Sequence, residues 1–259
     1  MATALLAMAA LGYWTAAIGF QVHLLRRNNR DWKKWTQLVL GSHALHTLAL
    51  VALTLHLGHF PLTHMREATA TFAWLLVGLH ALLGQRWKVE ALGSVAAPAA
   101  AVLTTISVFG ISHSEPILER GPWFFLHVGS LLSSYAAFSL AAASACIYFV
   151  QARRLKSKQL SGAFQLPSLT TLDQVAYRLI QVGYPLLVLG IASGMLITGW
   201  RWTWDAKETL VAVTGGVYLV YLYARMVGGW QGRRVNLLLL AAYLCVMISL
   251  VAPGQFHRF

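Results

Sequence analysis

Long apolar stretches alternate along the chain with short polar segments rich in arginine and lysine. Most stretches approach the ~20 residues that an α-helix needs to cross the hydrocarbon core of a bilayer. We therefore expect an all-α polytopic membrane bundle, folded as one membrane domain over residues 1–259, whose fifth helix is longer than one crossing. The apolar pattern predicts eight transmembrane helices, at 3–25, 36–57, 69–86, 93–112, 123–150, 177–198, 209–227 and 235–252.

The distribution of basic residues between the connections predicts the orientation of the helices. Of the 20 Lys and Arg residues, 15 fall in one set of alternate connections and five in the other. The positive-inside rule places the richer set in the cytoplasm, so both termini are expected outside. The longest connection, 151–176, is then cytoplasmic, and Thr171 is a candidate N-cap for the helical lead that follows. The first apolar stretch begins directly after Met1 without a basic region, which favours a transmembrane helix over a cleaved leader.

Composition supports a membrane protein and excludes other classes. The chain is 58% hydrophobic and only 11% charged, whereas soluble domains are roughly one quarter charged. The net charge of +12 comes from short basic clusters between apolar stretches, so lipid and not nucleic acid is the expected partner. Both cysteines, Cys146 and Cys245, lie inside apolar stretches without a CxxCH motif, which excludes covalent haem attachment to this chain.

The most unusual polar segment is 199–208, with the sequence GWRWTWDAKE. An interfacial aromatic belt explains one or two tryptophans, but not the charged residues that follow directly after them. Charges at membrane depth tend to be functional. If the segment is extended, alternate side chains share one side and could lie against a large planar ligand. The candidate binding residues here are Trp200, Trp202, Trp204, Asp205 and Lys207.

Ten histidines are many for a membrane chain, and two of them suit a metal porphyrin. His127 lies at the outer end of the fifth predicted helix, and His257 lies just past the eighth. Haem iron accepts axial imidazole ligands from separate elements that face a common slot. These two residues are therefore candidate metal ligands, flanking a haem that lies on the tryptophan segment. Zinc is a minor alternative, because the outer His59 and His64 lack cysteine ligands or an HExxH motif.

Four histidines, His23, His43, His46 and His80, lie in the inner half of the predicted membrane domain. His43 and His46 are spaced by three residues and share a helix face, and His80 falls at a similar depth on the third helix. A second, buried haem held by His46 and His80 is one interpretation. A hydrogen-bonded polar group inside the bundle is the other, and the sequence leaves both open.

The tryptophan segment resembles the "WWD" signature of the haem-handling cytochrome c assembly proteins, the CcsA/HemX/YpjD-like group. In that pattern a tryptophan-rich loop runs into W-D-P-K-E at the start of a helix. The resemblance is densest over residues 120–259. Three more segments match the pattern in order and spacing: LHV at 126–128 with SYA at 134–136, GWQGRR at 229–234, and GQFH at 254–257.

The resemblance implies a non-covalent, b-type haem with His127 and His257 as its two outer axial ligands and the tryptophan loop as its platform. Charge pairing makes Lys207, Arg201 and Arg258 candidate partners of the haem propionates. Asp205 and Glu208 would orient Lys207 or cap the seventh helix. CcsA-like members present haem at this site to an apocytochrome, whose thiols attack the vinyl groups.

Two positions depart from the family pattern. Ala206 replaces the usual proline, and Tyr223 stands where many CcsA members carry a membrane histidine. The short chain fits the HemX/YpjD branch, whose HemX-like members are associated with control of haem biosynthesis through a cytoplasmic enzyme. The main hypothesis is haem handling at the outer face of a bacterial inner (cytoplasmic) membrane, and two alternatives stay open. In the first, the protein controls haem biosynthesis by binding a cytoplasmic enzyme on segments 26–35 and 151–176. In the second, it is a structural subunit of a respiratory complex.

Overall fold

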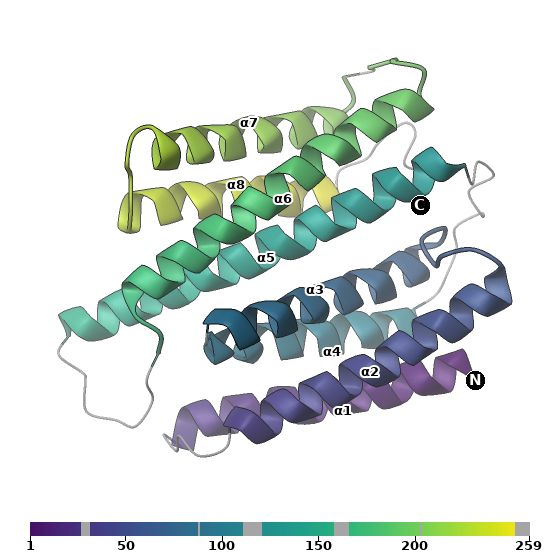
Figure 1. Cartoon of the computed structure of the whole chain (residues 1–259), viewed down its shortest axis with the longest axis horizontal. Helices are drawn as coiled ribbons and strands as arrows, with labels where there is room; N and C mark the ends of the chain where they lie inside the picture. Colours follow the sequence, from purple (N-terminus) through teal and green to yellow (C-terminus); the bar gives the residue numbers. More distant parts are fainter. Residues whose placement is uncertain (27–31, 88, 111–120, 158–165, 203, 252–259) are drawn as a thin grey trace. The chain divides into compact units, whose positions relative to one another are not determined.

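The computed structural model describes residues 1–26, 32–87, 89–110, 121–157, 166–202 and 204–251. These residues form eight α-helices and one short 3-10 helix, η1 (Glu90–Leu92), with no β-strand among them (Figure 1). The α-helices are α1 (Ala2–Arg26), α2 (Trp32–Leu57), α3 (Met65–Trp87), α4 (Gly93–Phe109), α5 (Pro122–Lys156), α6 (Leu169–Ile197), α7 (Ala206–Met226) and α8 (Arg233–Val251).

The helices confirm the expected all-α polytopic membrane fold. Six of them, α1, α2 and α5–α8, are long and apolar enough to cross a membrane. The 17 residues of α4 make it a shorter apolar helix. The 35 residues of α5 span about 52 Å at 1.5 Å per residue, against a hydrocarbon core of about 30 Å. The fifth helix is thus longer than one crossing, as its apolar stretch predicts.

Helix α6 begins eight residues before the predicted start, at Leu169 and not at residue 177. The N-cap is Ser168, whose hydroxyl accepts a hydrogen bond from the Thr171 backbone N–H at 3.1 Å. Thr171 as N-cap is therefore wrong, because it already lies inside the first turn. Polar residues in the first turns hid this part of the helix from the apolar pattern. Farther along, Pro185 lies inside the helix.

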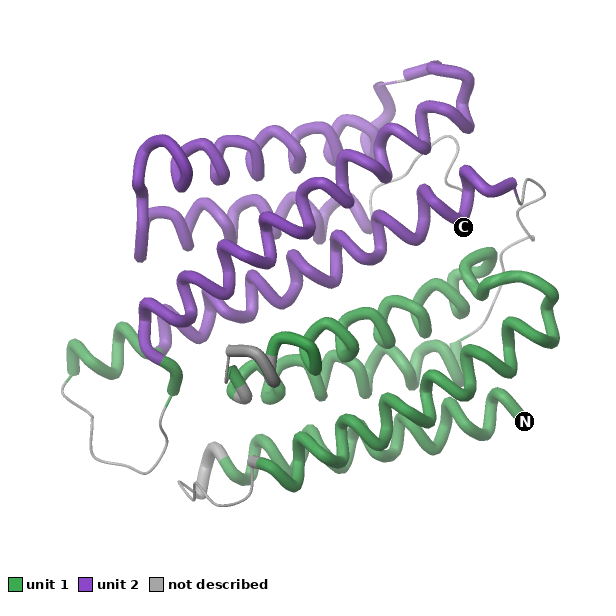
Figure 2. The backbone as a smooth tube through the Cα atoms, in the orientation of Figure 1, with its two compact units in different colours: residues 1–116, 151–167 green, residues 117–150, 168–259 purple. Residues whose placement is uncertain are grey.

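The chain forms two compact units, which Figure 2 colours separately. Unit 1 comprises residues 1–116 and 151–167, and contains α1–α4. Alanine and glycine let its helices approach closely, as small residues do in membrane bundles. A Cβ at Gly12 would overlap Ser42, and one at Gly19 would overlap the Trp35 ring. Tyr13 and Phe20 of α1 are fully buried in the core of this unit.

Unit 2 comprises residues 117–150 and 168–259, and it carries the candidate site. Three glycines of α6 lie against side chains of α5: Gly183 against Phe138, Gly190 against Leu131, and Gly194 against His127. The Phe138 ring also stacks on Tyr218 of α7, with the ring centroids 3.9 Å apart. Close packing along α6 thus places the start of α5 beside the end of α6.

Candidate functional site

The tryptophan segment begins with a tight turn that closes α6. The helix ends at Ile197, and Gly199 and Trp200 both take left-handed backbone conformations, with φ of 63° and 62°. The Trp200 N–H donates to the Met195 carbonyl at 2.8 Å, and the Gly199 N–H donates to the Leu196 carbonyl at 3.4 Å. This pair of bonds is the Schellman arrangement of helix C-termini. The helix therefore closes directly at the first tryptophan.

The turn contradicts an extended tryptophan segment with all three side chains on one side. Trp200 and Trp204 have positive φ, which breaks the alternation of an extended chain. Their side chains are 68% and 73% exposed. Trp202 is half-buried, and its indole N–H is buried without a hydrogen-bond partner among the described residues. Its ring meets Trp204 edge to face, with the centroids 5.9 Å apart.

The two acidic residues of the segment cap α7. The Asp205 carboxylate accepts a hydrogen bond from the Glu208 backbone N–H at 2.8 Å, and the Glu208 carboxylate accepts one from the Trp204 N–H at 3.1 Å. This reciprocal pairing is close to a capping box, and it places negative charge at the positive end of the helix. Of the two predicted roles for these residues, helix capping is confirmed. Asp205 also interacts electrostatically with Lys207.

His127 lies in the second turn of α5, and its orientation is fixed by α6. Its Nδ1 lies 2.7 Å from the carbonyl oxygen of Gly190. A carbonyl only accepts, so Nδ1 carries the proton, and the lone pair of the neutral ring is on Nε2. A Cβ at Gly194 would lie 2.8 Å from Nδ1 and Cε1 of the ring. One glycine therefore binds the imidazole through its backbone, and the other makes room for it.

The geometry of unit 2 brings several predicted site residues together. His127 lies within electrostatic reach of Lys207 at the start of α7, and Lys207 interacts with Asp205. The structure therefore places two elements near the imidazole: the last turns of α6, through Gly190 and Gly194, and the first turn of α7, through Lys207. The Arg201 side chain is exposed in the same segment. His257 and Arg258 lie outside the described residues, so their predicted roles stay predictions.

The inner histidines His46 of α2 and His80 of α3 lie in unit 1, beside different positions along α1. His46 is fully buried with its Nδ1 3.4 Å from the Tyr13 hydroxyl, and no described residue hydrogen-bonds its Nε2. His80 is buried beside Gly93, where Phe20 also packs. Tyr13 and Phe20 are seven residues apart, a rise of about 10 Å along the helix. The structure brings each histidine against α1, and their predicted role in binding haem stays a prediction.

His43 contacts a different neighbour from His46, although both lie on α2. Its ring stacks on Trp74 of α3, with centroids 5.7 Å apart and an interplanar angle of 19°. The spacing of three residues predicts that His43 and His46 share a face of α2. Their rings nevertheless contact different helices: His43 contacts α3, and His46 contacts α1. Aromatic packing thus accounts for the position of His43 without a bound metal.

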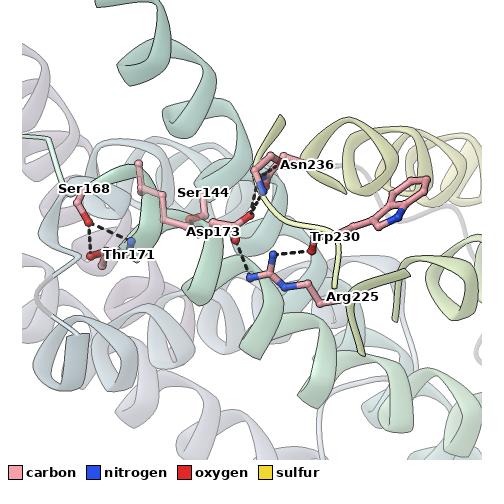
Figure 3. A network of polar contacts seen from close by, with 9 residues as sticks. Ser144, Ser168, Thr171, Asp173, Arg225, Trp230 and Asn236 are labelled. Carbon is pink, nitrogen blue, oxygen red and sulfur yellow. Dashed lines mark hydrogen bonds and ion pairs between the residues drawn. The ribbon is translucent and has the colours of Figure 1, made fainter. Parts of the chain in front are cut away.

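A buried ion pair in unit 2 was missed by the sequence patterns. The Asp173 carboxylate lies 2.6 Å from Arg225 of α7, and both side chains are only 7% exposed. The same carboxylate accepts hydrogen bonds from the Asn236 side chain at 2.8 Å and from the Gly232 N–H at 3.2 Å, and Arg225 donates to the Trp230 carbonyl at 3.0 Å (Figure 3). This network joins α6, α7 and α8.

The network explains the GWQGRR segment as a structural turn. Gly229 and Gly232 have φ of 62° and 72°, values that favour glycine. A Cβ at Gly232 would lie 3.0 Å from the Tyr148 hydroxyl. Arg225 counted only as a topology charge in the sequence, and Asp173 was hidden in a connection. An acid near the start of one apolar helix and a base in the last turn of the next would have been the signal.

Comparison with known proteins gives the family of the chain. The family model described as cytochrome C assembly protein matches residues 62–252. The cytochrome c biogenesis protein CcsA of Synechococcus sp. (strain RCC307) is 31% identical over 229 residues, which cover 76% of this chain and 74% of that protein. CcsA of Mesostigma viride is 26% identical over 81% of this chain and 79% of its own length. These matches confirm the resemblance seen in the sequence, and the chain is a multi-pass membrane protein that belongs to the cytochrome c assembly family.

Proposed function

We propose that this protein binds haem as cargo at the end of unit 2 where α6 ends and α7 begins, and presents it for cytochrome c assembly. The hydrogen bond of 2.7 Å between His127 Nδ1 and the Gly190 carbonyl carries the proposal. Histidines that ligate metals usually donate the other ring N–H to a carbonyl or carboxylate, which fixes the tautomer and the ring orientation. His127 has this arrangement before any iron is bound.

The surrounding residues fit a porphyrin in charge and in shape. Lys207, within electrostatic reach of His127, would pair with a propionate, as would the exposed Arg201. The exposed rings of Trp200 and Trp204 offer apolar area to the porphyrin plane, and Trp202 packs edge to face against Trp204. His257 is the second ligand in this proposal, and Arg258 a further propionate partner. Haem itself supplies an iron centre that accepts imidazoles and vinyl groups that react with thiols.

Absorption spectra of the full-length chain in mild detergent test the proposal. With haem supplied, the unaltered protein should show a Soret band and sharp α and β bands on reduction, as expected for two imidazole ligands. His127→Ala should abolish this low-spin spectrum. The matched control is His56→Ala, which removes an exposed histidine at the end of α2. Unchanged spectra in His127→Ala, or equal losses in both variants, would contradict the ligand assignment.

The orientation belongs to the same proposal. We place both termini on the outer side of a bacterial cytoplasmic membrane, an orientation that positive-inside counting supports. A single membrane domain over residues 1–259 is part of the proposal. His127 and the tryptophan segment then face outward, where apocytochromes meet haem. Labelling of single cysteines by an impermeant maleimide in intact cells tests this. Cysteine at Arg201 should react, cysteine at Arg153 should react only after lysis, and the reverse result would overturn the orientation.

One observation favours a second function, regulation of haem biosynthesis through a cytoplasmic enzyme. The last turn of α5 carries Arg153, Arg154 and Lys156, on a helix about 52 Å long that exceeds the hydrocarbon core. A basic helix end that projects from the membrane can bind an acidic protein surface. Co-purification of such an enzyme, lost when these three residues and Lys158 are changed to glutamine, would support regulation. Retention of the enzyme by that variant would exclude this docking surface.

A further inference from the structure

A polar cavity in unit 2 lies away from the residues of the haem proposal. Its volume is about 410 Å³, and it lies where the first turns of α6 meet the last turn of α7. The ion pair of Asp173 and Arg225 lies at this end of the unit. The lining residues are Gln174, Tyr177, Arg178, Gln181, Arg225 and Gln231.

The lining is rich in hydrogen-bond donors and poor in negative charge. Two guanidinium groups, three side-chain amides and one phenol line the cavity, and no carboxylate is among the lining residues. Asp173 pairs with Arg225, and Arg178 adds a second guanidinium to the lining. The contacts of Arg225 with Asp173 and Trp230 use two of the five N–H donors of a guanidinium. This chemistry favours an anion with several acceptor oxygens.

The lengths of the helices place the cavity at the depth of lipid headgroups. The 21 residues of α7 span about 31 Å, which matches a hydrocarbon core of about 30 Å, and Arg225 lies in its last turn. The 29 residues of α6 span about 43 Å, so its first turns extend past the core. Trp230, 47% exposed in the turn after α7, is the residue type typical of this interface.

We propose that this cavity binds a phosphate group, that of an anionic phospholipid headgroup at the membrane edge. Phosphate oxygens accept bidentate hydrogen bonds from arginine and further bonds from amide and phenol donors. Basic pockets between transmembrane helices are sites for such headgroups. Haem fits less well, because the lining residues include no histidine or cysteine to ligate its iron.

Native mass spectrometry of the delipidated full-length chain tests the site. The probes are phosphatidylglycerol, phosphatidylcholine and the soluble headgroup analogue glycerol 3-phosphate. Arg178→Gln and Gln181→Leu change exposed lining residues and leave the buried network intact. Arg153→Gln is the matched control, since it removes an exposed arginine that does not line the cavity. Loss of one charge-assisted contact should weaken phosphatidylglycerol binding by about tenfold in Arg178→Gln.

The outcomes separate the possible ligands. Selective binding of phosphatidylglycerol over phosphatidylcholine, reduced in Arg178→Gln but not in Arg153→Gln, supports the lipid headgroup. Binding of glycerol 3-phosphate with the same dependence, but without binding of phosphatidylglycerol, overturns the lipid headgroup in favour of a soluble organic phosphate. Equal binding by Arg178→Gln and Arg153→Gln overturns the proposal, as does equal affinity for the two lipids. Haem bound in an Arg178-dependent manner, with no phosphate bound, overturns it in favour of a carboxylate.

Discussion

The imidazole of His127 and the backbone carbonyl of Gly190 are joined by a hydrogen bond of 2.7 Å between α5 and α6. A backbone acceptor cannot change its rotamer, so the ring orientation depends on how closely the two helices approach. Gly194, one turn after Gly190, allows this approach because it has no Cβ to meet the ring. The position of the proposed ligand is therefore set by residues of α6 that need not touch haem.

Gly194→Ala should displace the ring without removing it. The new Cβ would lie 2.8 Å from Nδ1 and Cε1 of His127, so the imidazole must move and its hydrogen bond to Gly190 must lengthen. We expect the low-spin haem spectrum to weaken or shift toward high spin. Gly216→Ala is the control, because a Cβ there meets nothing within 4 Å on α7. A spectrum in Gly194→Ala identical to that of Gly216→Ala would show that this contact does not position the ring.

Asp205→Ala should destabilise the start of α7. The substitution removes the cap on the Glu208 N–H, and loss of an N-cap typically costs about 1 kcal/mol. Asp205→Asn should retain most of this stability, since an amide oxygen also accepts the bond. Thermal unfolding in detergent, followed by circular dichroism, measures both variants. If Asn and Ala were equally destabilising, the charge of Asp205 on Lys207 would matter more than the cap.

Asp173→Ala should be the most destabilising single substitution among these predictions. It leaves the Arg225 guanidinium buried without its counter-ion, a loss of about 3–5 kcal/mol in comparable pairs. Addition of Arg225→Leu should recover part of the loss, because an apolar pair needs no counter-ion. Unfolding in a mixed-micelle titration measures the series. A double variant as unstable as the sum of the two single variants would contradict the coupling.

Gly19→Ala should destabilise unit 1 by overpacking. The added Cβ would overlap the Trp35 ring between α1 and α2, and such strain typically costs 1–3 kcal/mol. Gly41→Ala is the matched control, on α2 with nothing within 4 Å of its Cβ. The control should be neutral or slightly stabilising. Equal unfolding midpoints for the two variants would indicate that the helices move apart at little cost.

The helices could be predicted because membrane spans need long apolar runs, which the sequence displays directly. The start of α6 could not, since its first turns are polar and its cap is Ser168, three residues before the Thr171 that resembles one. The cap on α7 was foreseeable, because Asp205 and Glu208 have the spacing of a capping box.

The shape of the tryptophan segment needed information that residue types alone do not supply. Left-handed φ at a tryptophan is unusual, so the residue type does not predict it. At Trp200 this conformation accompanies the hydrogen bond from its N–H to the Met195 carbonyl. The ion pair of Asp173 and Arg225 was equally hidden, because 52 residues separate its partners and only tertiary packing brings them together.

Pro185 lies inside α6, between the residues that contact α7 and α8 and the residues that contact His127. A proline has no N–H to bond the carbonyl four residues earlier, that of Gln181, so the helix has its weakest point between the two. Asp173 and the cavity lie before this point, and Gly190 and Gly194 lie after it. Pro185 therefore lies between the segment of α6 that is joined to α7 by an ion pair and to α8 by a hydrogen bond, and the segment that holds His127. A bend of α6 at Pro185 would therefore move the carbonyl that holds the imidazole while leaving the ion pair in place.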